Sequence, residues 1–271
     1  MPILWLRVAL GFYAVGLLCA LAALLRRDER LNRAALPAMA LGMVFQFVSL
    51  TEAVLISGKF TLTSAENSQS LLALLLMAAV LFIYLVYQTA APGIVVFPLV
   101  FLLTLLAAVT QQPFLALAAG AHKGWVFIHV ALILIGYVAL IVSFCASLLY
   151  LVQERSLKAK KLGGILSRLP ALEITDELGF RSLVLGFPFM TVGLIIGTVL
   201  ARSTYDRIDL LDPKIFLSYL MWAVYLVLLY TRWNAGFRGR RAAYFAMAAF
   251  LVAVVAWSAN YYGALNRFIR S

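Results

Sequence analysis

Long apolar runs separated by short polar stretches cover almost the whole chain. Each run is rich in Leu, Ala and Val and lacks the alternation of polar and apolar residues that marks a membrane-spanning strand. About 20 apolar residues suffice for a helix to cross a bilayer, and a helix satisfies its own backbone hydrogen bonds there. The pattern therefore predicts eight spanning helices, over residues 3–25, 35–57, 69–90, 93–110, 125–152, 181–202, 214–232 and 242–262.

Two boundaries need further argument. The stretch TAAPG at 89–93 separates the third helix from the fourth, with Pro92 and Gly93 as a tight turn. The alternative is one kinked segment over 69–110, but its 42 residues are far too many for one span. The stretch LEITDELGF at 172–180 predicts a short amphipathic helix that lies on the membrane surface before the sixth span.

Composition supports the same class of protein. Hydrophobic residues make up 65% of the chain and charged residues 12%, against roughly 45–50% and 25% in a soluble domain. We therefore expect an all-α integral membrane protein with a single transmembrane domain over residues 1–271. Cys19 and Cys145 lie within apolar runs without a second thiol nearby, which favours packing over a disulfide or a covalent haem attachment.

The basic residues predict the orientation of the helices. Fourteen of the 22 Lys and Arg residues lie around the connections after the first, fifth and seventh helices. Such a bias places those connections in the cytoplasm and both termini outside. The net charge of +11 then reflects orientation and contact with anionic lipid, and it does not indicate a nucleic-acid partner.

Both histidines lie in the stretch HKGWVFIHVALILIGYVAL at 122–140. His129 falls about one turn inside the outer face of the fifth helix. It is either a neutral imidazole hydrogen-bonded to a neighbouring helix or a ligand of a metal or haem iron, and composition alone leaves both interpretations open. His122 falls in the preceding loop. The two histidines cannot sandwich one haem from a single helix, because they would lie on one face, about 10 Å apart along its axis.

Few other polar residues fall within the spans. Glu52 is a candidate proton relay or ion ligand, or a carboxylate that reaches the interface. Gln46 predicts a hydrogen bond between helices, and Gly193 and Gly197, spaced as GxxxG, predict close helix packing. The chain has no Walker loop, dinucleotide fingerprint or zinc-spaced cluster, so nothing indicates an enzyme of a known soluble class.

Five stretches carry a resemblance to a known family: GWVFIHVALILIGYVALIVSFCASLLYLVQE at 124–154, LPALEITDELGFRSLVLGFPFMTVGLIIGTVLA at 169–201, DPK at 212–214, WAVYLVLLYTR at 222–232 and GFRGRRAAY at 236–244. They are similar to the cytochrome c assembly family of haem-handling membrane proteins, which includes CcsA, CcmC and the HemX-like proteins. The resemblance is strong over residues 122–262 and weaker over residues 1–121.

The resemblance implies haem translocation, or presentation of haem at the outer face for attachment to apocytochrome c. In the family, outer-face histidines hold haem under a Trp-rich WWD segment, and His129 matches one of them. The implied cofactor is a non-covalent b-type haem with His129 as the candidate ligand of its iron. The candidate haem-binding residues are His129, Trp125, Tyr137, His122 and Asp212. Asp212 is also placed to cap the seventh helix, ahead of Pro213 in its first turn.

The chain also departs from the family's pattern. RSTYDRIDLLDPK at 202–214 keeps the Asp-Pro-Lys but lacks the tryptophans. Counting from the shared motifs, Gln46 and Tyr230 fall where full synthases carry transmembrane histidines, and Asn266 falls close to the second external histidine. The chain therefore resembles short HemX-like or YpjD-like members of a bacterial inner membrane, with haem-synthesis or cytochrome c maturation proteins as partners.

Two alternatives stay open beside a haem-handling protein. One is a non-haem accessory or scaffold protein that keeps the fold, docks a partner on its basic cytoplasmic loops, and regulates haem synthesis or complex assembly. The other is a small transporter that uses Glu52, which is disfavoured because the sequence shows no inverted repeat or pair of broken helices.

Overall fold

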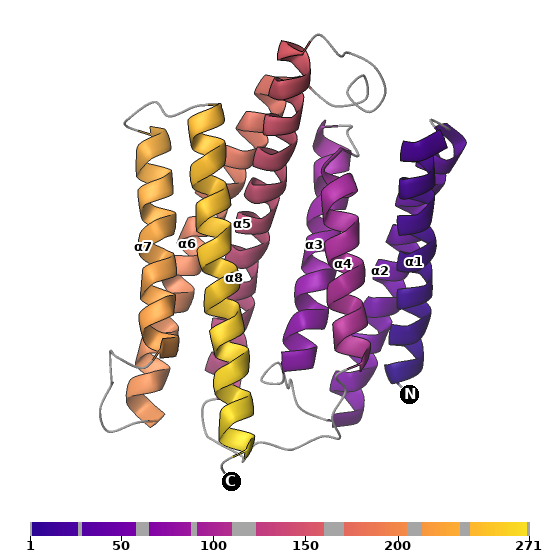
Figure 1. Cartoon of the computed structure of the whole chain (residues 1–271). Helices are drawn as coiled ribbons and strands as arrows, with labels where there is room; N and C mark the ends of the chain where they lie inside the picture. Colours follow the sequence, from indigo (N-terminus) through magenta and orange to yellow (C-terminus); the bar gives the residue numbers. More distant parts are fainter. Residues whose placement is uncertain are drawn as a thin grey trace. The chain divides into compact units, whose positions relative to one another are not determined.

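The computed structural model describes residues 2–26, 29–57, 65–87, 91–109, 123–159, 171–204, 213–233 and 239–269. Within these ranges the chain forms eight α-helices and no strand (Figure 1). The helices are α1 (Pro2–Arg26), α2 (Glu29–Ser57), α3 (Ala65–Tyr87), α4 (Ala91–Val109), α5 (Lys123–Lys158), α6 (Leu172–Thr204), α7 (Pro213–Trp233) and α8 (Arg240–Ile269). Seven of these described helices, α1 to α7, are long and apolar enough to cross a membrane. The prediction of an all-helical membrane protein is confirmed.

The helices group into two compact units. Unit 1 comprises Met1–Lys123 with Arg155–Pro170, and unit 2 comprises Gly124–Glu154 with Ala171–Ser271. Unit 1 therefore holds α1 to α4, and unit 2 holds most of α5 together with α6, α7 and α8. The expectation of a single transmembrane domain over residues 1–271 stays a prediction.

The predicted surface helix at 172–180 is wrong as a separate element. These residues form the first turns of α6, which continues without a break into the sixth predicted span. The fifth helix likewise continues past its predicted end at 152, to Lys158. The two extensions contact each other, because the buried Thr175 hydroxyl lies 3.4 Å from the side-chain oxygen of Gln153. Packing against α5 therefore holds the start of α6 in line with its span.

The break between the third and fourth predicted spans is confirmed, but its position is corrected. α3 ends at Tyr87 and α4 begins at Ala91. Pro92 and Gly93, predicted as the turn, lie in the first turn of α4. Proline is favoured there because a backbone N–H in the first turn has no acceptor within the helix.

Unit 1 is held together partly by a buried polar cluster. The Tyr13 hydroxyl of α1 donates to the Gln46 side-chain oxygen of α2 at 2.6 Å. The Gln46 amide nitrogen lies 2.9 Å from the backbone oxygen of Ser70 and 3.1 Å from its hydroxyl, both on α3. All three side chains are buried. The interhelical hydrogen bond predicted for Gln46 is confirmed, and it links three helices.

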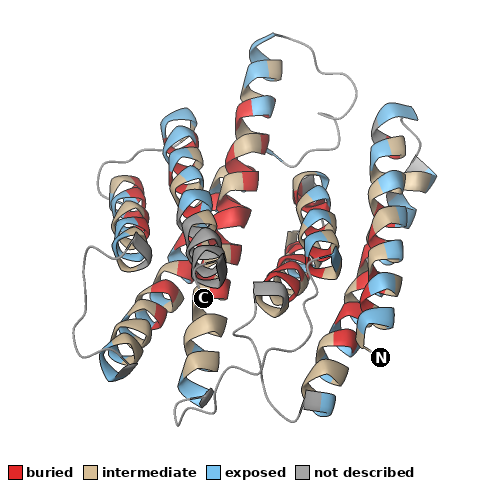
Figure 2. Ribbon diagram, turned by 60° about the horizontal axis from the view of Figure 1, so that its bottom comes forward, coloured by how far each residue is buried: buried red, intermediate tan, exposed pale blue. Residues whose placement is uncertain are grey.

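Unit 2 packs around residues from all four of its helices. Leu140 of α5, Leu183 of α6, Tyr225 of α7 and Ala246 of α8 belong to one buried cluster. Figure 2 shows buried positions, drawn in red, along the sides of these helices. The small alanines in this cluster allow the helices to approach closely.

A line of glycines on α6 faces α5. In this line each glycine lies close to one residue of α5: Gly179 to Ala146, Gly186 to Ala139, Gly193 to Ile133, and Gly197 to His129. Spacings of seven, seven and four residues keep the four glycines on one face of the helix. A methyl group on Gly186 would lie only 2.3 Å from the Ala139 methyl carbon. The packing role predicted for Gly193 and Gly197 is confirmed.

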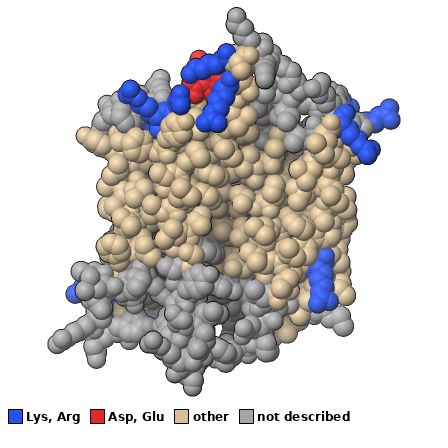
Figure 3. Space-filling view, in the orientation of Figure 1, with Lys and Arg blue, Asp and Glu red and all other residues tan. Residues whose placement is uncertain are grey.

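Charged side chains gather at helix ends. On the face that Figure 3 shows, described charged side chains gather at one end of the helices, and further basic side chains lie toward the other end. Arg155 and Lys158 end α5, and Arg240 and Arg241 begin α8. This distribution is typical of a protein in which the middle of each helix is surrounded by membrane hydrocarbon. That these ends lie in the cytoplasm stays a prediction. That both termini lie outside also stays a prediction.

Candidate functional site

His129 lies near the beginning of α5 and is half-buried. At 1.5 Å per residue, it is about 9 Å along the helix from Lys123. Its Nδ1 atom lies 2.7 Å from the backbone oxygen of Gly193 on α6. A hydrogen bond therefore connects the imidazole to the neighbouring helix, as one of the two predicted interpretations requires.

Gly197 makes room for this contact. In an α-helix a carbonyl points toward the residue four positions later. A ring that reaches the oxygen of Gly193 must therefore lie over residue 197. A methyl carbon there would lie 2.4 Å from Cε1 of His129, 2.8 Å from Nδ1 and 3.2 Å from Nε2. The GxxxG spacing thus serves the imidazole as well as the helix contact.

This hydrogen bond determines which ring nitrogen of His129 carries the proton and which can bind a metal. A backbone carbonyl only accepts hydrogen bonds, so Nδ1 carries the proton. In the neutral imidazole Nε2 then holds the free lone pair. Among the described residues, no hydrogen-bond partner of Nε2 is found. Histidines that bind metals commonly have this arrangement, with one nitrogen on a backbone carbonyl and the other on the metal. As one ligand, His129 fits haem iron.

The structure places the other predicted residues unequally. Trp125 lies one turn before His129 on the same face of α5, and 56% of it is exposed. Tyr137 lies about 12 Å further along the helix, where it packs against the buried cluster of unit 2. It supports helix packing and is not beside the imidazole. His122 and Asp212 lie outside the described residues, while Pro213 begins α7 as predicted.

The positions matched to the family's other histidines differ from His129. Gln46 is buried, and both ends of its side-chain amide form hydrogen bonds within unit 1. Tyr230 on α7 is 61% exposed. Asn266 belongs to α8, but its side chain is not among those described. Glu52 is partly buried in α2.

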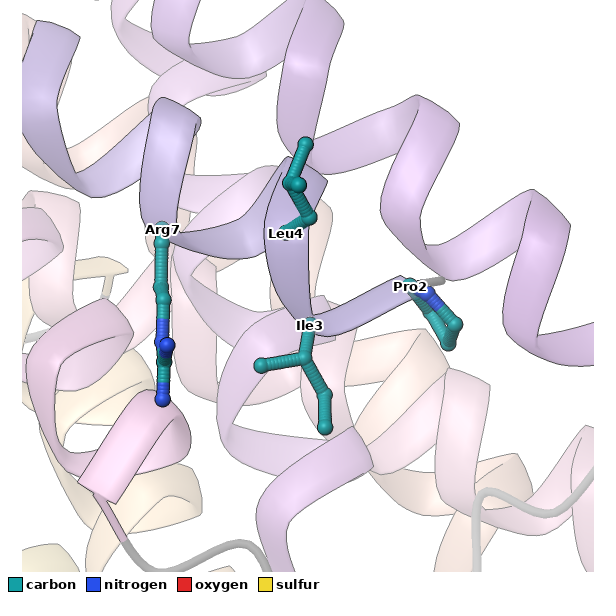
Figure 4. A pocket seen from close by; sticks show the side chains of 4 residues that line it. All are labelled: Pro2, Ile3, Leu4 and Arg7. Atoms are coloured by element: carbon teal, nitrogen blue, oxygen red, sulfur yellow. The ribbon is translucent and has the colours of Figure 1, made fainter.

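A cavity of about 360 Å³ opens beside the first turns of α1 in unit 1. Pro2, Ile3, Leu4 and Arg7 line it, as Figure 4 shows. Of the candidate haem residues that the structure describes, none lines it. In the part of the chain that the structure describes, no three His, Cys, Asp or Glu residues come together to hold a metal ion.

Sequence reasoning missed a buried ion pair in unit 2. Arg232, near the end of α7, lies 2.8 Å from a carboxylate oxygen of Asp176 on α6. The same Arg232 nitrogen donates to the backbone oxygen of Asp176 at 3.1 Å, and the guanidinium lies 5.2 Å from the centre of the Phe180 ring. Only 4% of the Arg232 side chain is exposed. The pair ties α7 to the part of α6 that had been predicted as a surface helix.

The long apolar helices define a multi-pass α-helical membrane protein. Residues 64–263, well over half of the chain, match the family described as cytochrome C assembly protein. The chain therefore belongs to the cytochrome c assembly family, and this supports a haem-related membrane function. The match begins at residue 64, further upstream than the strong resemblance at 122–262.

Individual relatives agree with this assignment. The chain is 32% identical over 138 residues to the cytochrome c biogenesis protein CcsA of Chlamydomonas reinhardtii, covering 50% of this chain and 37% of that protein. It is 30% identical over 127 residues to the protein HemX of Brevibacillus brevis, covering 47% of each. It is 28% identical over 217 residues to the CcsA of Guillardia theta, covering 72% of this chain and 71% of that protein.

Most of these matches are partial. The chain spans about half the length, or less, of the first curated relatives that it matches. No solved structure matches it.

Proposed function

We propose that this protein handles haem at the outer face of a membrane, with His129 as a ligand of the haem iron. The observation that carries the proposal is the contact between His129 Nδ1 and the Gly193 oxygen at 2.7 Å. Because Nδ1–H donates to this oxygen, the other ring nitrogen, Nε2, keeps a lone pair that can bind a metal. Family membership supports haem as the group that takes this lone pair.

The chain's own residues supply binding and orientation. His129 is fixed on a helix and by a bond to a second helix, which favours a ligand over the loop histidine His122. Trp125, one turn away on the same face, would cover one side of a bound macrocycle. Haem itself supplies the iron and four of its ligands. We also propose a bacterial cytoplasmic membrane as the location, with haem-synthesis or cytochrome c maturation proteins as partners.

The second axial position is expected to hold a weak ligand or none. Gln46, Tyr230 and Asn266 stand at the positions that match the family's other histidines, so none of these positions offers the iron a second imidazole. We therefore expect haem that dissociates readily, with a spectrum unlike that of a bis-histidine cytochrome. We expect no enzyme of a known soluble class.

The test is an absorption spectrum of the protein purified from cells with an adequate haem supply. We expect a Soret band that is lost in His129→Ala and kept in His122→Ala. Retention in His129→Ala with loss in His122→Ala would reassign the ligand. No Soret band in the parent protein would favour the alternative function, a membrane scaffold that keeps the fold without the cofactor.

A further inference from the structure

We infer that Gly197 is a positioning residue that fixes His129 in the tautomer with the proton on Nδ1. This deepens the haem proposal by naming the residue that controls its ligand, and its haem-related consequence rests on that proposal. The tautomer itself does not depend on haem. It follows from contacts between α5 and α6 within unit 2.

The contact leaves the imidazole little freedom. The Gly193 oxygen is 2.7 Å from Nδ1, and the Gly197 α-carbon lies under the edge of the ring that contains Cε1. A ring flip would point carbon, in place of N–H, at the carbonyl oxygen and forfeit the bond. Because the carbonyl can only accept, the proton stays on Nδ1. Nε2 is then the only nitrogen of His129 that can bind a metal.

Gly193 and Gly197 have different roles although both face α5. A methyl group on Gly193 would meet Cδ1 and Cγ1 of Ile133 at 2.9 and 3.0 Å and the Ile133 backbone nitrogen at 3.3 Å. A methyl group on Gly197 would meet the rigid ring of His129 at 2.4 Å. Alanine at 197 therefore pushes the ring off the accepting carbonyl, whereas alanine at 193 presses on Ile133 and not on the ring.

For metal binding, the consequence is that Nε2 becomes a stronger lone-pair donor. A hydrogen bond from Nδ1–H to a carbonyl orients the ring and raises the basicity of the other nitrogen. Without Gly197 the ring would turn, and either nitrogen would carry the proton. Haem affinity would then fall although His129 itself remained.

Nuclear magnetic resonance of protein labelled with ¹⁵N-histidine tests the tautomer directly. The chain has two histidines, so His122→Gln assigns both ring spectra. In haem-free protein at mildly alkaline pH, we expect the shift pattern of an Nδ1–H imidazole for His129. Gly197→Ala should convert it to the Nε2–H form or to an exchanging mixture. Gly124→Ala should keep it, because a methyl group on Gly124 meets nothing within 4 Å.

A second measurement covers the case in which Gly197→Ala folds poorly. We expect Gly197→Ala to lower the thermal unfolding midpoint of the parent protein but to have little effect in a His129→Ala background, where the clashing ring is gone. An equal loss in both backgrounds would show that Gly197 serves helix packing alone. An Nε2–H tautomer in the parent, or an unchanged tautomer in Gly197→Ala, would also overturn the inference.

These outcomes are separable from those of the haem proposal. If the parent protein shows no Soret band but His129 has the Nδ1–H tautomer, the haem function fails and the role of Gly197 stands. If haem binds, Gly197→Ala should weaken or shift the Soret band, and Gly124→Ala, whose added methyl group meets nothing within 4 Å, should leave it in place. A Soret band insensitive to Gly197→Ala would remove the link between the glycine and the ligand.

Discussion

Replacing Asp176 with asparagine removes one charge from the ion pair between α6 and α7 while keeping the size of the side chain. The Arg232 guanidinium then loses its carboxylate partner at 2.8 Å. It keeps the hydrogen bond to the Asp176 backbone oxygen and the contact with the Phe180 ring. Because 4% of the Arg232 side chain is exposed, water cannot fully replace the lost partner.

The expected loss of unfolding free energy follows from burial. Breaking a fully buried ion pair by removing one partner costs roughly 3–5 kcal/mol. The Asp176 side chain is 21% exposed, and Arg232 keeps its contacts with the Asp176 backbone oxygen and the Phe180 ring, so we expect about 2–3 kcal/mol. The matched control is Glu177→Gln on the next residue. Its pair with Arg181 is 50% and 64% exposed, and such pairs contribute only about 0.3–0.5 kcal/mol.

The assay is reversible unfolding in mixed micelles, with circular dichroism as the signal. The Asp176→Asn change is measured in the parent protein and in Arg232→Met, which removes the buried cation. We expect its cost to fall by at least about 1 kcal/mol in the second background, as for residues in direct contact. If Asp176→Asn cost no more than Glu177→Gln, or the same amount in both backgrounds, the buried pair would not stabilise unit 2.

Three further predictions concern packing and orientation. Gln46→Leu should lower the unfolding free energy by about 1–3 kcal/mol, because two buried partners lose their hydrogen bonds. The control Thr51→Val removes an exposed hydrogen bond within its own helix and should change the unfolding free energy by less than about 0.5 kcal/mol. Equal effects of the two substitutions would contradict this prediction. Gly186→Ala should lower the unfolding free energy by about 1–3 kcal/mol through overpacking. The control Gly11→Ala adds a methyl group with nothing within 4 Å and should not lower it. An unchanged unfolding free energy in Gly186→Ala would show that α5 and α6 can move apart to accommodate the methyl group. A tag between residues 232 and 241 should react only from the cytoplasmic side, and labelling from outside would reverse the predicted orientation.

The existence of the helices was predictable, and the ends of α5 and α6 were not. Hydropathy reports where apolar residues stop, which coincides with the edge of the hydrocarbon. A helix continues past that edge when its backbone bonds and side-chain contacts continue. Gln153 and Thr175 are polar, so hydropathy ended the fifth span before Gln153 and began the sixth after Thr175, yet their contact joins the two helices there.

The candidate site was predictable only in part. His129 stood out because an ionisable residue within a span is rare. Its contact with Gly193 and Gly197 joins positions 64 and 68 residues apart, and the periodicity of one helix does not reveal which face of another it meets. The same reason hid the pair of Arg232 with Asp176, 56 residues apart. The available signal was an antiparallel pair of helices with glycines repeating on one and a histidine at the matching depth of the other.

Gln46 and His129 are both polar side chains within predicted spans, and their hydrogen bonds distinguish them. The amide of Gln46 accepts a bond from Tyr13 at one end and donates to Ser70 at the other, so helix association alone explains its burial. The imidazole of His129 uses one nitrogen for Gly193, and among the described residues the other has no partner. A histidine serving only to link α5 and α6 needs one nitrogen, and a serine or asparagine would form that bond with less steric demand on Gly197. The second nitrogen is what the larger ring adds, and the haem ligation that we propose gives this nitrogen a role that helix packing does not require.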